Sequence, residues 1–287
     1  MLLWIRRFFA ASVLFNVIIG NGIKQMFGMA GETEFDLRFY FMGIPVRVHP
    51  IFWLSSAWIV WASANGDMRK VLIGVLCIFV SVLVHELGHA VMSRRYGFPS
   101  EIVLYILGGY ATATRFSTWR NVKVSAAGPG AGFALFGLTY AVMRFMMANY
   151  PATLVDNSLV AFALQMMLFA NLMVNVMNLV PCLPLDGGRI AEALINRYGG
   201  RDTILKTIRV GIFAAGAVVL RGIFCINNPD ASMFPIPQSL FPSFVVEDRI
   251  YTWLTSGIQP DPKFLVIFFG FLGAQQIINY NEINGRR

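Results

Sequence analysis

The feature that most restricts how this chain can fold is its series of long apolar runs. Six stretches carry few charges, at residues 51–64, 71–93, 122–147, 159–180, 204–225 and 264–280. A helix needs about 20 apolar residues to cross a hydrocarbon core of roughly 30 Å, so the first run is short and the other five fit. We therefore expect an all-α polytopic membrane protein with about six transmembrane helices.

The composition agrees with this interpretation. Hydrophobic residues make up 56% of the chain and charged residues 13%, whereas soluble globular chains carry roughly 45–50% and about 25%. The net charge of +8 would suggest nucleic acid in a soluble protein, but here the basic residues lie between apolar runs, so no nucleic-acid partner is expected.

The basic residues also predict an orientation. With six crossings, 17 of the 23 Lys and Arg residues lie on one side of the bilayer and six on the other. The positive-inside rule makes the richer side cytoplasmic. If the short first run does not span, the amino-terminal charges change sides, and the remaining loops still favour the same orientation.

The rest of the chain is expected to lie at or near the membrane. Residues 43–48 and 101–110 are predicted as short membrane-associated strands, and the proline- and aromatic-rich stretch 227–262 as a surface loop. Residues 1–22 fit a signal peptide, a surface helix or an anchor. This predicts three parts: an amino-terminal segment and strand at 1–50, a transmembrane core at 51–198, and a carboxyl-terminal helix pair at 199–287.

The strongest chemical signal lies in the second apolar run. Its sequence is His85-Glu86-Leu87-Gly88-His89, and residues four apart share one face of a helix, so both histidines can bind one zinc ion. Glu86 lies beside that face, where a carboxylate can act as general base toward water that the metal activates. Ionisable groups are costly inside a bilayer, which argues against a merely packed polar face.

A catalytic zinc needs a third protein ligand and an open position for water. Asp186 follows the fourth run, in Pro184-Leu185-Asp186-Gly187-Gly188, and helices two and four end on the same side of the bilayer. We expect Asp186 to complete a site for one Zn²⁺ per chain, and also to begin the next helix. The cysteines Cys77, Cys182 and Cys225 show no CxxC pairing and are expected to be core residues.

Together these residues resemble the site-2 protease family of intramembrane zinc metalloproteases, especially compact prokaryotic members without PDZ or CBS domains. The resemblance covers about residues 43–198. It rests on the HExxH motif, Gly108-Gly109, Ala127-Gly128-Pro129, and the stretch from Asn178 to Asp186-Gly187-Gly188. The family often has Asn shortly after its Ala-Gly-Pro motif, where this chain has the small residues Gly130, Ala131 and Gly132.

The resemblance implies a three-helix catalytic core that cleaves single-span membrane protein substrates within the bilayer. It implies that His85, His89 and Asp186 bind zinc, that Glu86 is the general base, and that Asn178 contacts substrate or oxyanion. It also implies a bacterial or archaeal inner membrane, with the active site toward the cytoplasm. The substrate's identity and the oligomeric state do not follow from it.

A helical substrate must unwind before its carbonyls can be attacked. Residues 101–107 are apolar and β-branched, so we expect this strand, through Val103 and Tyr105, to offer an edge to the unwound substrate near Gly108 and Gly109. Asn171 and Asn175 share a helix face with Asn178, and either packing or substrate contact would explain them.

Two other interpretations stay open at this stage. The chain could be a catalytically inactive zinc-binding scaffold or a transporter, although a scaffold would not need Glu86. His49, the third histidine, could join the zinc set, but a residue at the entrance of a span is the simpler explanation.

Overall fold

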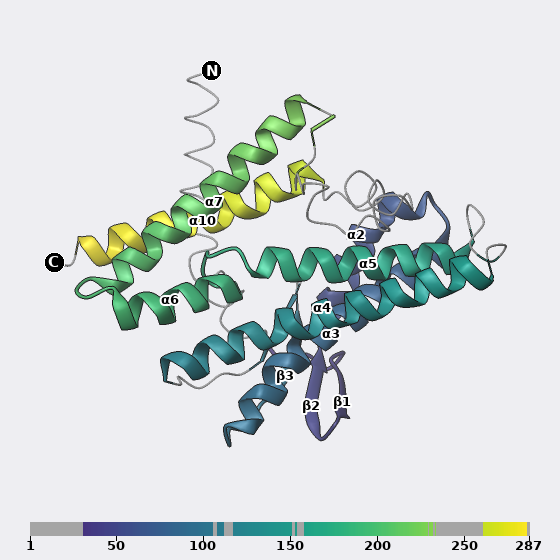
Figure 1. Cartoon of the computed structure of the whole chain (residues 1–287), viewed down its shortest axis with the longest axis horizontal. Helices are drawn as coiled ribbons and strands as arrows, with labels where there is room; N and C mark the ends of the chain where they lie inside the picture. The colour runs from purple at the N-terminus through teal and green to yellow at the C-terminus, as the bar shows by residue number, and fades with distance from the viewer. Residues whose placement is uncertain are drawn as a thin grey trace.

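The computed structural model describes residues 31–105, 108–111, 117–150, 153, 158–228, 230–231, 233 and 261–285 (Figure 1). Within them, five helices are long and apolar enough to cross a membrane: α3 (Met68–Arg95), α4 (Thr118–Asn149), α5 (Leu159–Asn178), α7 (Thr203–Asn227) and α10 (Pro262–Asn284). They coincide with the five longer apolar runs, which confirms a polytopic membrane protein. The expectations for residues 1–22 and for most of 227–262 fall outside the described residues.

The first expected span is a shorter helix, α2 (Pro50–Ala64). Its 15 residues rise about 22 Å, which is less than the hydrocarbon core. The helix begins at His49, whose Nδ1 accepts a hydrogen bond from the Ile51 amide, and it ends at Asn65 with φ of 50°. These two ends limit α2 to a length that does not span a bilayer alone.

Helices α3, α4 and α5 pack on one another and form the central bundle. Lipid tails are as apolar as leucine, so helices in a bilayer associate where small residues let their backbones approach. Gly88 of α3 provides such a contact, because a Cβ there would come within 3.0 Å of the Ala127 carbonyl and of Ala131 on α4. This close approach lies between the two motif histidines.

A four-stranded sheet in the order β1-β2-β3-β4 lies beside the bundle (Figure 1). Its strands are β1 (Leu37–Phe41), β2 (Ile44–Val48), β3 (Ile102–Tyr105) and β4 (Gly108–Ala111). Strands β1 and β2 are antiparallel, β2 and β3 parallel, and β3 and β4 antiparallel. Ile44, Val46 and Val48 alternate along β2 and are buried in the core shared with α2 and α3.

Two details of the sheet differ from the sequence expectation. The predicted strand 101–110 is a hairpin of β3 and β4, and β2 has a partner, β1, that was not predicted. The alternation of Leu37, Phe39 and Phe41 buries only Phe39, and that only in part, so this strand is specified mainly by its pairing with β2. Its turn to β2 has positive φ at Met42 and Gly43, as tight hairpins require.

Helices α7 and α10 lie side by side and form a second pair (Figure 1). The Arg209 guanidinium donates a hydrogen bond to the Tyr280 hydroxyl across them. The short helix α6 (Asp186–Tyr198) packs on both α4 and α7 and so connects the pair to the bundle. Gln276 of α10 adds a direct contact, because its Nε2 donates to the Leu183 carbonyl at 2.9 Å.

Candidate metal centre

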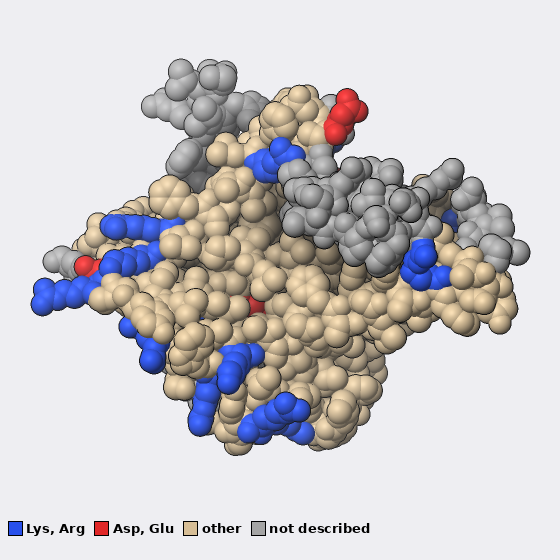
Figure 2. All heavy atoms as spheres, viewed as in Figure 1, with Lys and Arg blue, Asp and Glu red and all other residues tan. Residues whose placement is uncertain are grey.

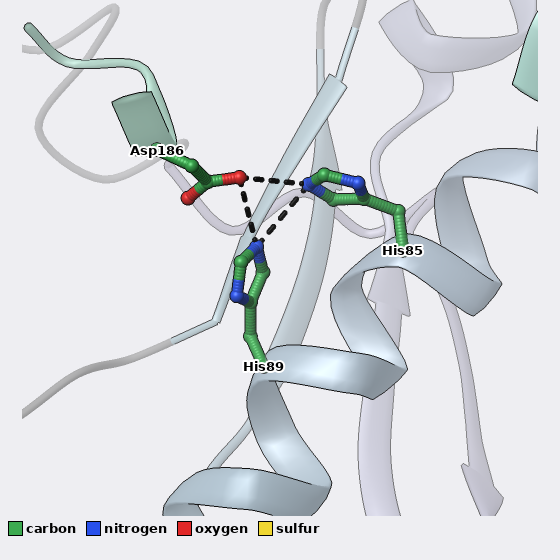
Figure 3. Close-up of side chains that lie close together, drawn as sticks. All are labelled: His85, His89 and Asp186. Carbon is green, nitrogen blue, oxygen red and sulfur yellow. Dashed lines mark hydrogen bonds and ion pairs between the residues drawn. The ribbon is translucent and has the colours of Figure 1, made fainter. Parts of the chain in front are cut away.

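Three buried side chains meet where α3 approaches the start of α6 (Figure 3). The Nε2 atoms of His85 and His89 lie 3.2 Å apart, and each lies 3.1 Å from Oδ2 of Asp186. Within the described part of the chain, this is the one group of His, Cys, Asp and Glu side chains with the geometry of a metal site. The two expected histidines and the expected aspartate are thus brought together.

The distances fit one tetrahedral ion. Zinc binds histidine nitrogen and carboxylate oxygen at about 2.0–2.2 Å, which places neighbouring ligand atoms of a tetrahedron roughly 3.3–3.5 Å apart. The three observed separations are 3.1–3.2 Å, slightly shorter than that edge. Two imidazole nitrogens and one carboxylate oxygen are also a donor set typical of catalytic zinc, with a fourth position left for water.

The other nitrogen of each ring orients it. Nδ1 of His85 lies 2.9 Å from Oδ1 of Asn175 on α5, and Nδ1 of His89 lies 2.7 Å from the Val124 carbonyl on α4. Both partners are acceptors, so both Nδ1 atoms carry the proton. The Nε2 lone pairs then face the centre, which is the tautomer that zinc requires.

Asp186 reaches the centre because of the glycines that follow it. A Cβ on Gly187 would come within 3.0 Å of the Leu179 carbonyl, and a Cβ on Gly188 would do so against Cys182 and Leu183. The first turn of α6 therefore packs directly on the loop after α5. Burial raises the pKa of Asp186, but the two histidine rings lower it more, and the net shift leaves the group a carboxylate.

Glu86 lies beside the centre without being one of its three ligands. It follows His85 on α3, and only 5% of it is exposed. None of the described residues forms a hydrogen bond with its carboxylate, whereas both histidines and Asp186 are close enough to interact with its charge. Its carboxylate is therefore not committed to a structural hydrogen bond with any of these residues.

The expected substrate-binding residues lie in two places. Asn178, at the end of α5, donates from Nδ2 to its own helix at the Val174 carbonyl. Val103 and Tyr105 lie on β3, which is paired with β2 on one side and β4 on the other. The edge expected at residues 101–107 is therefore occupied, and among the described strands the outer edges belong to β1 and to β4, the strand of Gly108 and Gly109.

The third histidine and the cysteines take no part in the centre. The ring of His49 caps α2 and packs edge-on against Tyr105, with the ring centroids 4.8 Å apart. Cys77, Cys182 and Cys225 are free and buried, and burial raises the pKa of the Cys182 thiol to about 11, so it stays protonated. The cysteines are core residues, as expected, and His49 lies at the start of α2.

Two supporting contacts were not predicted. The Asn175 amide behind His85 and the Val124 carbonyl behind His89 both come from helices other than α3. The spacing of Asn171, Asn175 and Asn178 marks a polar helix face, and that was the one signal in the sequence for Asn175. A backbone carbonyl such as that of Val124 leaves no signal at all.

The fold and the centre together define a polytopic membrane protein that holds a zinc-type His₂Asp site between its helices. The sequence model of Peptidase family M50 matches residues 73–158 and 144–220, which is more than half of the chain. The chain belongs to Peptidase family M50, and its centre has the geometry to hold a metal ion.

Individual relatives agree with this assignment. A zinc metalloprotease of Methanocaldococcus jannaschii is 29% identical over 194 residues, covering 66% of this chain and 54% of the relative. A putative zinc metalloprotease of Synechocystis is 29% identical over 187 residues, covering 59% and 47%, and one of Mycobacterium tuberculosis is 34% identical over 149 residues, covering 50% and 35%. The matched region spans about half the length of the first two relatives.

The fold also matches a solved structure. The site-2 protease from Methanocaldococcus jannaschii superposes with a TM-score of 0.50 at 23% sequence identity, and the match covers 86% of this chain and 95% of that one. This likeness concerns the fold alone. It agrees with the expected architecture of a helical membrane protein with a helix bundle and short strands.

Proposed function

We propose that this protein is an intramembrane zinc metalloprotease that hydrolyses peptide bonds of single-span membrane proteins near the cytoplasmic face. The observation that carries the proposal is the convergence of His85, His89 and Asp186 at zinc-ligand spacing, beside Glu86, on helices long enough to span a bilayer. Family membership and the zinc metalloproteases among the relatives support it.

In this mechanism each residue has one role. His85, His89 and Asp186 hold the ion, which when bound polarises the scissile carbonyl and makes water acidic enough to be deprotonated near neutral pH. Glu86 accepts that proton and delivers it to the leaving amine. No side chain forms a covalent bond with the substrate, so peptide hydrolysis consumes only water.

The proposed zinc site lies close enough to the end of α3 for water to reach it. His89 is six residues before Arg95, the end of α3, which at 1.5 Å per residue is about 9 Å. Most Lys and Arg side chains seen in this view lie along the lower and left sides of the molecule (Figure 2). Arg94 and Arg95 lie in the last turn of α3. The positive-inside rule supports our proposal that this end of α3 faces the cytoplasm of a bacterial or archaeal cell.

The substrate segment must be extended to expose its carbonyls. We propose that it adds as a strand to the outer edge of β4, at Gly108 and Gly109, and that Asn178 contacts it or the oxyanion. Adjacent residues of a strand direct their N–H groups to opposite sides. Of the variants Gly109→Pro and Tyr110→Pro, one therefore removes a donor from the outer edge, and slowed cleavage with full zinc content is expected for it. Unchanged cleavage by both variants would argue against this edge.

We propose the same three parts of the chain that the sequence predicts, at residues 1–50, 51–198 and 199–287. Residues 51–198 contain all the proposed catalytic residues, and 199–287 contain the pair α7 and α10, which packs mainly on itself. We propose that 51–198 is the catalytic core, that 199–287 supports it, and that 1–50 contributes the β1–β2 hairpin.

The deciding experiment compares the purified protein with its Glu86→Gln variant. Bound zinc is quantified in both, and cleavage of a panel of single-span membrane proteins is followed. The expected result is about one zinc in each protein and cleavage by the parent alone. A parent that binds zinc and cleaves nothing would support the scaffold interpretation, and a folded parent without zinc would refute the metal site.

A further inference from the structure

Asn175 of α5 is fully buried behind the zinc ligand His85. Its two polar atoms have different partners. The amide nitrogen Nδ2 donates to the Asn171 carbonyl of its own helix, and Oδ1 lies 2.9 Å from Nδ1 of His85. The side chain thus connects the backbone of α5 to a zinc ligand on α3.

These partners determine which way the amide faces. A backbone carbonyl only accepts hydrogen bonds, so the group facing Asn171 must be the NH₂ of Asn175. The oxygen is then left for His85, and Nδ1 of His85 must be the donor. A reversed amide would place two oxygens against each other at Asn171, which is why the tautomer of His85 follows from the position of Asn175.

A second helix holds the amide in place. Gly132 of α4 lies so close that a Cβ there would come within 3.0 Å of Oδ1, Nδ2 and Cγ of Asn175. The amide is therefore confined between the α5 backbone, the His85 ring and the α4 backbone. Because the Asn175 amide cannot move, it fixes the orientation of the His85 ring as well as the ring nitrogen that carries the proton.

The neighbouring asparagines of the same face lack this contact. Asn171 donates from Nδ2 to the Met167 carbonyl and Asn178 to the Val174 carbonyl, each one turn back along α5. Among the described residues, neither has a hydrogen bond to His85 or His89. All three asparagines donate to the backbone of α5, which is a packing contact. Of the three, Asn175 alone has a hydrogen bond with the zinc ligand His85.

We propose that Asn175 is a positioning residue that sets the tautomer and orientation of His85 and thereby the zinc affinity of the centre. The inference rests on the zinc site of the proposed function. His89 receives the same support from a backbone carbonyl, which no substitution can remove. Asn175 is therefore the side chain through which sequence changes can tune the affinity.

The test measures zinc affinity directly, by titrating metal-stripped protein in the presence of a competing chelator. Outer partners of zinc ligands typically contribute 10–100-fold to affinity. Asn175→Leu, which keeps the branched shape and the number of heavy atoms, and Asn175→Ala should both bind zinc 10–100-fold more weakly. Asn175→Asp keeps an acceptor for Nδ1 but loses the donor to the Asn171 carbonyl, so its zinc affinity should lie between those of the parent and Asn175→Leu.

Asn171→Ala is the matched control. It removes an equally buried amide from the same helix face without touching His85, so its affinity should stay within about threefold of the parent. Gly132→Ala displaces the Asn175 amide without removing it and should also weaken binding, which keeps the test decisive if Asn175→Ala does not fold. Cobalt(II) absorption should change for Asn175→Leu and not for Asn171→Ala.

The outcomes separate this inference from the proposed function. Parent-like affinity in Asn175→Leu, or an equal loss in Asn171→Ala, would overturn the positioning role while leaving the protease proposal intact. A parent that binds zinc but cleaves no substrate would overturn the protease, and the affinity comparison would still decide the role of Asn175. A parent that binds no zinc would overturn both.

Discussion

Adding one methyl group at Gly128 of α4 should destroy the zinc site. Gly128 faces the ring of His89, and a Cβ there would come within 3.0 Å of Nε2, Cε1 and Cδ2, at 2.8 Å for Cδ2. Ordinary contacts begin at about 3.4 Å. The ring edge that carries the zinc-binding nitrogen must therefore move by about 1 Å in Gly128→Ala.

The ring has no easy way to accommodate that movement. Its Nδ1 already lies 2.7 Å from the Val124 carbonyl, so it cannot move further toward α4 on that side. Separating the helices would break the close contact of Gly88 with Ala127, and such overpacking typically costs 1–3 kcal/mol. Metal–ligand distances tolerate only about 0.2 Å, so a 1 Å shift removes His89 from the coordination shell.

The magnitude follows from that loss. Disturbing an outer partner alone costs 10–100-fold in metal affinity, so loss of a ligand should weaken zinc binding by at least about 100-fold, or roughly 2.7 kcal/mol. The assay is a chelator-competition titration of metal-stripped protein in detergent. Gly130→Ala is the control, because nothing lies within 4 Å of its added Cβ, and it should bind zinc like the parent.

Two results would refute this reasoning. Parent-like zinc affinity in Gly128→Ala would mean that the His89 ring does not lie against α4 as the structure has it. An equal loss in Gly130→Ala would mean that α4 tolerates no methyl group on either face, and that the effect does not come from contact with the ring.

Three further predictions test other parts of the structure. Asp186→Asn should lose zinc and cleavage together, measured by metal content, whereas retained stoichiometric zinc would remove Asp186 from the ligand set. Burial raises the pKa of Asp36, but hydrogen bonds from Thr33 and Arg47 lower it below its usual value, so the Asp36–Arg47 ion pair stabilises the β1–β2 hairpin above about pH 4 and is lost in more acidic solution. The protection factors of the hairpin amides, which correct for the intrinsic pH dependence of hydrogen exchange, should fall there in the parent and depend less on pH in Asp36→Asn. Gln276→Leu removes the donor to the Leu183 carbonyl and should lower the thermal unfolding temperature by a few degrees, at a cost of about 1–3 kcal/mol for the unpaired carbonyl.

Local periodicity determined a large part of this protein. Five spans follow from long apolar runs with few charges, and the HExxH spacing puts His85 and His89 on one face of α3 wherever that helix lies. The sequence also showed the apolar run that forms α2, but the 15 residues of this helix are too few to span a bilayer. These features depend on residues within a few turns of one another, so a pattern in the sequence is sufficient to reveal them.

The sheet shows where such patterns fail. β1 buries only Phe39, and that only in part, so it is held mainly by its pairing with β2. β3 and β4 form a hairpin, which leaves β3 paired on both sides and moves the open edge to β4. Strand pairing is a relation between segments, and the composition of one segment does not report it.

The zinc site divides in the same way. His85 and His89 are four residues apart, but Asp186 is 101 residues and Asn175 90 residues from His85. The motif and helix topology were enough to predict that Asp186 meets the two histidines, whereas the hydrogen bonds of Asn175 and Val124 depend on how closely α3, α4 and α5 pack. That packing is set by Gly88, Gly128 and Gly132, whose missing side chains matter only once the helices are in contact. The sequence by itself therefore determined the spans and the ligand types, and the tertiary structure decided which atoms orient them, because hydrogen bonds between helices depend on interhelical distances that no local pattern encodes.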